Sequence, residues 1–484
     1  MDAGKLAEGR GMIDRQELAE LARELSLSLT VVEKDYVLGW LLAGISANET
    51  LAKHWIFKGG TCLKKCYFET YRFSEDLDFT ITEEAQLDEG FLLAAFRDIS
   101  AWIYEESGIE IPADQVRFKI ADIPGGKYAE GRVYYVGPLQ QRRNLARIKF
   151  DLTSKEKLVL APEEREVHHP YSDRPETGIH ILSYCFEEVF AEKVRALAER
   201  ERPRDLYDVV HLYRHDEIRP DRSVVMSTLR EKCAFKNIPV PNRDSLMRPD
   251  AREKLLAEWE DMLAHQLPVL PPFEQFWDEL PQVFDWLNEV AEKPTYAAMQ
   301  TREAIDDSWQ PPAMVQAWHV AVPLESVRFA AANRLCVNLQ YQNTWRLIEP
   351  YSLRRSSDGN LLLYAVRHED GEVRAYRVDK IQGVEVSKIS FIPKYPVELT
   401  PAGSLYAAEI QRRSVSTTRS FATQPKARSR AVFSTSSGPT HVFRCSACGK
   451  LFKRKSYAAA LNPHKNKQGH PCYGSFGTFV KTEY

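Results

Sequence analysis

Apolar residues along the chain alternate between helical and strand spacing. Between Leu18 and Leu25 they recur every three or four residues. A second apolar stretch begins at Thr30, a good helix cap, and carries Glu33 three residues later. These patterns predict helices over residues 12–46.

Strands are expected next. Residues 56–80 have the pattern of a strand, a glycine turn, a short helix and a second strand, and residues 184–215 predict two helices separated by Pro203. The stretch "NLARIKFDLT" predicts another strand, with Ile148, Phe150 and Leu152 on one face and Lys149, Asp151 and Thr153 on the other.

The pattern of apolar residues changes towards the C-terminus. Residues 216–295 predict helical segments interrupted by Trp and Pro. From about residue 327 the apolar runs become short and β-rich, and "SSDGN" and "HEDGE" interrupt them as hairpin signals. A small β-barrel of about five strands is therefore expected in this region.

Length and composition favour a multidomain globular protein. At 484 residues, with 44% hydrophobic and 27% charged residues, the chain is too long for one core. It has no apolar run of about 18 residues, so no membrane span is expected. The charged N-terminus lacks the apolar core of a secretory signal, so a cytoplasmic location is expected.

Charge is distributed unevenly. From Ile410 to Tyr484 there are 14 Lys or Arg residues and a single acid, Glu483, which gives +13 and leaves −16 for the rest of the chain. A basic tail of this kind indicates either a nucleic-acid contact or docking onto the acidic body.

The stretch "FKGGTCLKKCYFETYRFSEDLDF", residues 57–79, carries the strongest chemical signal. Asp76 and Asp78 are two residues apart in a strand, so their carboxylates share one face while Leu77 and Phe79 point into the core. Two close carboxylates repel each other unless cations neutralise them, and Mg²⁺ prefers carboxylates together with substrate phosphates. An Asp-x-Asp pair alone is more often simply solvated.

The preceding turn favours the same substrate. Gly59 and Gly60 let the backbone approach a phosphate closely, and Thr61 is expected to cap a helix over residues 62–70. Asp151, on a separate strand, could supply a third carboxylate. Lys58, Lys64, Lys65 and Arg72 are cations within reach.

Two stretches together resemble the AbiEii/MenT group of nucleotidyltransferase-like toxins, known from type IV toxin–antitoxin and phage-abortive systems. They are "KGGTCLKKCYFETYRFSEDLDF" and "FEEVFAEKVRALAERERPRDLYDVVHLYR", and "VEKDYVL" at residues 32–38 is also similar. The resemblance spans residues 15–290. It implies Asp76 and Asp78 as ligands of Mg²⁺ or Mn²⁺, Asp151, Lys193 and Asp208 as further catalytic residues, and Gly59, Gly60, Thr61, Lys65 and Ser74 as the nucleotide-binding set.

Some roles within this set stay open. Lys193 and Asp208 could instead form an ion pair between two helices, and either Lys64 or Lys65 could face the phosphate. Arg204 and Asp205 are weaker candidates, since Asp205 could simply cap its helix. The resemblance implies transfer of a nucleoside monophosphate from an NTP to an RNA acceptor, with the tRNA 3′ end as the expected target and an antitoxin protein as an expected partner.

A second resemblance covers the β-rich region. "WRLIEPYSLRRSSDGNLLLYAVRHEDGEVRAYRVDKI" is similar to WYL-type domains, which are Sm/SH3-like barrels that sense nucleotides or nucleic acid. Arg346 belongs to the matched start of the motif. Arg374 and Arg377 could bind phosphate, because guanidinium groups fit phosphate oxygens. They could also be ordinary exposed arginines on a hairpin.

The last 44 residues predict a metal-stapled module. Cys445 and Cys448 have the spacing of a two-thiolate knuckle, and tetrahedral zinc needs two further ligands. Cys472 is the expected third ligand and His464 the fourth, because His470 lies too close to Cys472. So small a module with little apolar content needs a staple, and a structural Zn²⁺ is expected.

The expected fold class is α+β: a nucleotidyltransferase-like mixed sheet with a helical C-terminal part, then a small SH3/Sm-like β-barrel and a small zinc module. The alternative function is a catalytically degenerate nucleotide-sensing regulator that binds DNA or RNA. The expected domains are a catalytic core (1–215), its helical extension (216–300), a linker (301–325), a WYL-like barrel (326–405), a basic flexible linker (406–440) and a zinc-binding module (441–484).

Overall fold

A computed structural model of the chain forms two compact units, Met1–Thr417 and Thr418–Tyr484. Most of the predicted linkers over 301–325 and 406–440 lies outside the described residues. The structure describes residues 12–215, 220–300, 303–306 and 324–399, and then 440–445, 447–448, 450–454, 464–465, 471–472 and 477–483.

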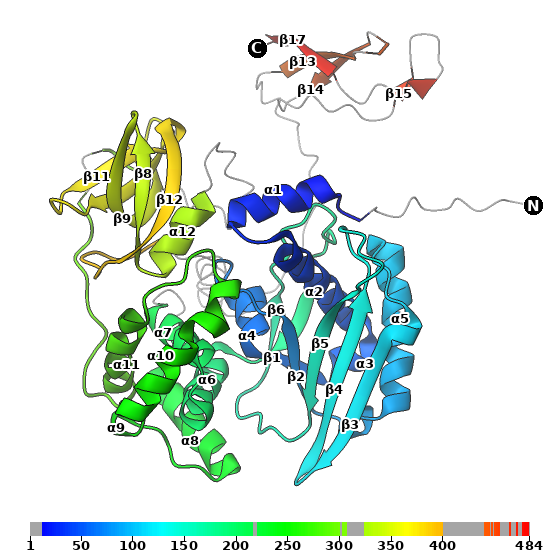
Figure 1. Ribbon diagram of the computed structural model, residues 1–484. Coiled ribbons are helices and arrows are strands. Elements are labelled where there is room, and N and C mark those ends of the chain that lie inside the picture. The colour runs from blue at the N-terminus through cyan, green and yellow to red at the C-terminus, as the bar shows by residue number, and fades with distance from the viewer. Residues whose placement is uncertain are drawn as a thin grey trace, which may run out of the picture. The chain divides into compact units, whose positions relative to one another are not determined.

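A mixed sheet of seven strands organises the first unit (Figure 1). Its strands are β1 (Trp55–Lys58), β2 (Asp76–Ile81), β3 (Val116–Ile123), β4 (Gly126–Tyr135), β5 (Ala146–Thr153), β6 (Glu163–Glu166) and β7 (His180–Ser183). They lie in the order β3-β4-β5-β2-β1-β7-β6. β2 runs parallel to β5 and β1 parallel to β7, and the other neighbours are antiparallel.

Helices of the N-terminal half accompany this sheet, and α2 and α5 pack against each other and against its strands. They are α1 (Arg15–Leu25), α2 (Leu29–Ala47), α3 (Glu49–Ala52), α4 (Gly59–Cys62) and α5 (Glu89–Ser107), with 3₁₀ turns η2 (Glu84–Gln86) and η3 (Ala113–Gln115).

A helical part follows the sheet, in which α6 packs on α7 and α8, and α7 packs on α10 and α11. Its elements are α6 (Phe186–Arg200), α7 (Pro203–Arg214), α8 (Arg222–Lys236), α9 (Arg243–Leu246), α10 (Pro249–Leu263), the 3₁₀ turn η4 (Ala264–Gln266) and α11 (Phe273–Leu287). Together with the mixed sheet, these helices confirm the predicted α+β class.

Helix α2 begins earlier than its sequence pattern predicts. The cap is Ser28, whose Oγ accepts a hydrogen bond from the Val31 backbone N–H, so Thr30 lies inside the first turn. Nearly all residues from Val32 to Ile45 are buried. A helix that is buried on almost all sides belongs in a protein interior, so α2 forms part of the core together with its buried Glu33 and Asp35.

The helix predicted over residues 62–70 both starts and ends about three residues sooner. α4 begins at Gly59 and continues as a π-helical turn, η1 (Leu63–Tyr67), which ends at Phe68. Thr61 is not its cap. Its hydroxyl instead donates a hydrogen bond of 2.5 Å to the Asp76 carbonyl oxygen and ties the turn to the start of β2.

A smaller antiparallel sheet follows in the same unit, in the order β11-β10-β9-β8-β12. We call this sheet and the helix that leads into it the β-domain (residues 324–399). Its five strands match the number predicted from the sequence, and β11 and β12 form the edges. Its elements are α12 (Leu324–Ala332), β8 (Leu335–Tyr341), β9 (Thr344–Arg355), β10 (Leu361–Arg367), β11 (Val373–Arg377), the 3₁₀ turn η6 (Val378–Lys380) and β12 (Ile381–Ser390).

The second unit contains a three-stranded sheet, β14-β13-β17, and a two-stranded ribbon of β15 and β16. Phe443 and Cys445 on β13 are buried in its small apolar cluster. The described strands are β13 (Thr440–Cys445), β14 (Leu451–Arg454), β15 (His464–Lys465), β16 (Pro471–Cys472) and β17 (Gly477–Glu483).

Candidate active site

A polar pocket of about 380 Å³ opens in the first unit where β2 begins. The β1–α4 turn and β5 form one side of it, and the end of α6 and the start of α7 form the other. Eight cations and seven carboxylates line it. The lining residues are Lys58, Gly59, Gly60, Arg72, Ser74, Asp76, Asp78, Lys149, Asp151, Glu156, Glu192, Lys193, Arg195, Ala196, Glu199, Arg200, Arg202, Arg204 and Asp205.

Three aspartates gather on the sheet side of the pocket. Asp76 and Asp78 share one face of β2, while Leu77 between them is fully buried. β5 runs parallel to β2 and places Asp151 beside Asp78 and Lys149 beside Asp76. The Asp151 carboxylate accepts a hydrogen bond from Lys149 (2.8 Å) and another from the Tyr128 hydroxyl.

The carboxylates on β2 carry an electrostatic cost. Burial, followed by the charge of Asp151, raises the pKa of Asp78 to about 6. Burial also raises the pKa of Asp76, although Lys149 opposes the shift. Oxygen donors of this kind suit Mg²⁺ or Mn²⁺, and a bound cation would relieve the cost. Among the described residues, the carboxylate oxygens of these three aspartates do not all lie within 4.8 Å of one another.

The two glycines of the turn allow close approach to the backbone. Gly59 has φ of +81°, and a Cβ there would lie 2.2 Å from Oδ2 of Asp78. A Cβ on Gly60 would lie 2.6 Å from Nη2 of Arg72. Any larger residue would therefore push a carboxylate or a guanidinium out of the pocket.

Arg72 and Lys193 are held at the pocket by one buried carboxylate. Asp208 accepts hydrogen bonds from Nε and Nη2 of Arg72, at 2.7 and 2.8 Å, and lies 2.7 Å from Nζ of Lys193. The Tyr71 hydroxyl donates to it as well. Burial opposes ionisation of Asp208, but Arg72 and Lys193 outweigh it and hold its pKa well below the usual range.

Asp208 is fully buried and does not line the pocket. Its contacts with the pocket run through Arg72 and Lys193, which do line it, and its catalytic role stays a prediction. The Lys193–Asp208 contact is an ion pair between α6 and α7, as the alternative interpretation held, but it is buried rather than on the surface.

Arginines around the junction of α6 and α7 form the opposite side of the pocket. Arg195, Arg200 and Arg202 line it and were not among the sequence candidates, whereas Arg204 was considered a weaker one. In the sequence, Arg200, Arg202 and Arg204 lie at every second position around Pro203, and this concentration of positive charge could have indicated a phosphate-binding segment. Burial, followed by the charge of Arg72, lowers the pKa of Arg204. Cations crowd here as carboxylates crowd on β2, so the pocket suits a polyanion accompanied by a metal.

Asp205 lies inside the first turn of α7 and does not cap it. It accepts two hydrogen bonds from Arg200, at 2.7 and 2.8 Å, and lies 3.6 Å from Lys193. The helix instead begins with Pro203 in its first turn, as its sequence predicts.

Three candidate phosphate ligands, Lys65, Lys64 and Thr61, do not line the pocket. The Lys65 side chain is fully buried, and its Nζ lies 2.7 Å from Oδ2 and 3.0 Å from the carbonyl oxygen of Asp35 on α2. Lys64 is also buried and donates to the Glu69 carbonyl oxygen. Neither lysine lines the site, and the Thr61 hydroxyl donates its hydrogen bond to the Asp76 carbonyl oxygen. Ser74, Gly59 and Gly60 do line it.

The arginines singled out in the β-domain are not brought together. Arg346 on β9 donates to the Tyr341 carbonyl oxygen at 2.5 Å. Arg374 pairs with Glu372, and Arg377 lies 2.7 Å from Asp379. Arg374 lines a separate cavity of about 680 Å³ beside Tyr364, and the other two do not.

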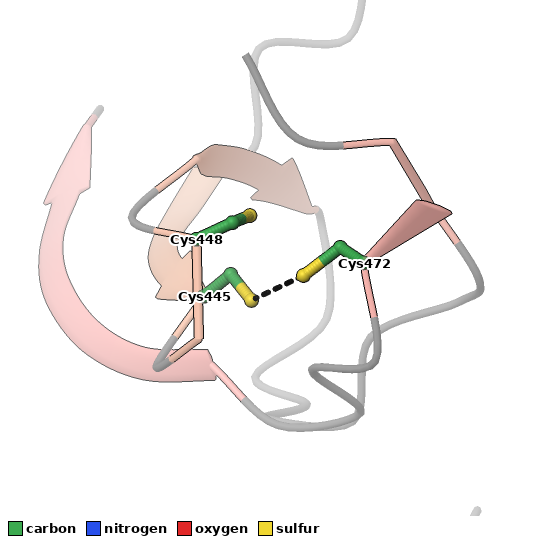
Figure 2. Close-up of side chains that lie close together, drawn as sticks. All are labelled: Cys445, Cys448 and Cys472. Atoms are coloured by element: carbon green, nitrogen blue, oxygen red, sulfur yellow. Dashed lines mark hydrogen bonds between the residues drawn. The ribbon is translucent and has the colours of Figure 1, made fainter. Parts of the chain in front are cut away.

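Three cysteines converge in the second unit (Figure 2). The sulfur atoms of Cys445, Cys448 and Cys472 all lie within 4.8 Å of one another, and Cys445 and Cys472 are 3.9 Å apart. Such a set could hold a metal ion. Backbone pairing of β15 with β16 places His464 opposite Cys472, but the His464 side chain lies outside the described part of the structure, as does His470.

Among the described helices, none combines the length and the apolar character needed to cross a membrane.

Comparison with known proteins identifies two regions. The family described as nucleotidyl transferase AbiEii toxin, type IV TA system, matches residues 40–286, and the WYL domain family matches residues 323–386. A search of curated proteins gives no match.

Among solved structures, the chain is similar to MenT4, a nucleotidyltransferase toxin from Mycobacterium tuberculosis H37Rv. The identity is 19%, the match covers 56% of this chain and 89% of the other, and the TM-score is 0.38. It is also similar to JHP933 from Helicobacter pylori, with 16% identity, coverage of 55% and 94%, and a TM-score of 0.36.

The buried pair of Asp35 and Lys65 generates a stability prediction. Asp35→Ala leaves the Lys65 ammonium in the interior without its carboxylate, so the free energy of unfolding should fall by about 3–5 kcal/mol. Urea denaturation of the full chain measures this change. The double variant Asp35→Leu/Lys65→Met removes both charges and should recover most of the loss. A fall below about 1 kcal/mol for Asp35→Ala would contradict the assignment of Lys65 to the core.

Proposed function

This chain belongs to the AbiEii family of nucleotidyltransferase toxins, and from that premise we propose that its pocket transfers a nucleoside monophosphate from an NTP to an RNA acceptor, the tRNA 3′ end. The family match confirms the resemblance drawn from the sequence, and the WYL match does the same for residues 323–386. One observation carries the residue assignment: three aspartates face a cluster of arginines and lysines across a single pocket.

In the proposed reaction, an acceptor hydroxyl attacks the α-phosphorus of the NTP. A new P–O bond forms, and the bond to pyrophosphate breaks. Asp76 and Asp78, with Asp151 beside them, would hold Mg²⁺ or Mn²⁺, and such metals stabilise charge on the entering and departing oxygens. The Gly59–Gly60 turn and Ser74 would receive the phosphates.

The cations of the pocket have a separate part in this proposal. Arg72 and Lys193, fixed by Asp208, would neutralise the triphosphate, and the arginines around Pro203 would bind its departing end. Preorganised charges contribute most where charge develops in the transition state, because they need no rearrangement at that moment. Rigid anchoring of Arg72 by two hydrogen bonds to Asp208 suits this requirement.

The alternative, a degenerate nucleotide-sensing regulator, is less well supported. Asp76, Asp78, Asp151 and Lys193 all line the pocket, and a scaffold without catalysis would not need this costly grouping of charges. We further propose that the toxin works in the cytoplasm, in a toxin–antitoxin or phage-defence system, and that an antitoxin protein is its partner.

Replacing either carboxylate on β2 should abolish nucleotide transfer. Asp76→Ala or Asp78→Ala should lower the rate on the order of 100-fold or more, because each carboxylate supports charge neutralisation in the transition state. The assay incubates the purified chain with each labelled NTP and total tRNA. Asp122→Ala, an exposed aspartate on β3 of the same sheet, is the matched control and should keep the original rate. A wild-type rate in either β2 variant would refute the assignment.

We propose that the cysteine cluster, with His464 as fourth ligand, holds a structural Zn²⁺. Metal analysis should find one zinc ion per chain, and Cys448→Ser or chelation should remove it and unfold residues 441–484. The catalytic unit should remain folded, since it forms a separate compact unit. Cys66→Ser, in η1 of the first unit, should leave the zinc content unchanged. Purified chain without zinc would rule out this site.

The basic tail should supply much of the affinity for tRNA. Residues 410–484 carry a net charge of +13, and each phosphate neutralised releases counterions, so binding should weaken steeply as salt rises. Removing residues 411–484 should flatten the dependence of log Kd on log salt, in filter-binding titrations, while NTP binding stays unchanged. If the tail instead docks onto the acidic body, truncation should leave affinity unchanged or raise it. Equal slopes for the two chains would exclude the nucleic-acid role.

A further inference from the structure

Helix α12 of the β-domain is buried on every side. All nine of its residues are buried, and it contacts β8, β9 and β12 of its own domain as well as α1. Among these residues are two charged ones, Glu325 and Arg328. Charged side chains are almost never buried without partners. The partners of Glu325 and Arg328 therefore identify the segments to which α12 is attached.

The first connection runs from α12 to the segment that carries Arg72. Nη2 of Arg328 lies 3.0 Å from Oε2 of Glu69, and Nη1 lies 3.3 Å from Oε2 of Glu325. The Thr70 hydroxyl donates to Oε1 of Glu325. Glu69 and Thr70 lie just before Arg72, so α12 fixes the backbone that delivers this guanidinium to the pocket.

The second connection runs to the helix that carries Asp208. Asn333, directly after α12, is 1% exposed, and its Oδ1 accepts hydrogen bonds from the Tyr207 hydroxyl (2.9 Å) and from Nε2 of His211 (3.2 Å). Tyr207 immediately precedes Asp208 on α7. The ring of Tyr71, whose hydroxyl donates to Asp208, lies 5.7 Å from the ring of Tyr207.

Both connections therefore end on residues close in the chain to Arg72 or Asp208, the two partners of a buried ion pair. We propose that Glu325, Arg328 and Asn333, which we call the clamp, are positioning residues for nucleotidyl transfer, so that the β-domain completes the active site from behind. This inference rests on the proposed function of the pocket. Apolar side chains could seal such an interface as well or better, whereas directed polar contacts specify the position of what they hold.

The test compares substitutions in the clamp with a matched one elsewhere in the β-domain, in the full chain. Asn333→Ala and Arg328→Met should weaken binding of a non-hydrolysable NTP with Mn²⁺ and lower kcat/KM, each by about 3- to 30-fold per folded molecule. Asn338→Ala, the same change on strand β8, should alter neither. Arg328→Lys keeps a cation beside Glu69 and should recover much of the loss. A purely structural role would lower Tm without changing NTP affinity per folded molecule.

Hydrogen exchange separates failure of the clamp from failure of the proposed reaction. Asn333→Ala should speed amide exchange in residues 68–76 and 203–214, whether or not the wild-type chain transfers nucleotides, and Asn338→Ala should not. Glu325→Gln, which preserves side-chain shape, provides a second variant if Asn333→Ala does not fold. Unchanged exchange in both segments together with unchanged NTP affinity would overturn the proposal.

Discussion

The arrangement of the pocket depends on one buried carboxylate. Asp208 receives Arg72 through two hydrogen bonds and Lys193 through a third contact, and all three side chains come from different elements. Taking an ionised carboxylate out of water is costly unless its partners surround it, and here they do. Arg72 lies just before β2 of the sheet, and Lys193 and Asp208 lie on α6 and α7 of the helical part. The β-domain reaches α7 through the hydrogen bond between Asn333 and Tyr207. Loss of Asp208 would leave two cations without a buried counter-charge, so the pocket and the core of the first unit share one electrostatic requirement.

Asp76 and Asp78 on β2 and Arg204 on α7 give the pocket two ends of opposite charge, although Lys149 and Arg200 beside them are paired with carboxylates. On β2, burial and the charge of Asp151 raise the pKa of Asp76 and Asp78, and at the start of α7, burial and Arg72 lower the pKa of Arg204. A metal–triphosphate complex brings a cation and a polyanion together and suits both ends at once. The proposed substrate would thus compensate charge that burial in the pocket makes unfavourable.

Local rules predicted the sheet side of the site well. The period of two in a strand placed Asp76 and Asp78 on one face and Leu77 in the core, and both features are present. The period of two in a strand cannot predict which polar residues are buried. Lys64 and Lys65 look alike in the sequence, and only the π-helical turn and the nearby Asp35 show that both lie inside the protein. A periodicity argument cannot show which of two lysines has a buried partner far away in the chain.

Long-range partners account for the other differences. The family resemblance implied a catalytic role for Asp208, but it could not show that three donors from other segments enclose this carboxylate. The expected domain bounds placed Glu325 at the end of a linker and Arg328 at the start of the β-barrel. Their partners near Glu69 lie more than 250 residues earlier, a separation at which no local pattern has information.

The complete burial of α12 also bears on the order of synthesis. A ribosome makes the chain from its N-terminus, so the sheet and the helical part emerge well before residues 324–333. Until then, the underside of the Arg72 segment and of α7 lacks its cover of Glu325, Arg328 and Asn333. A toxin with this layout completes its catalytic half late in translation. A truncated messenger RNA that ends before the codons for residues 324–333 would yield a fragment without Glu325, Arg328 and Asn333. In that fragment the polar groups beneath the pocket would lack these partners.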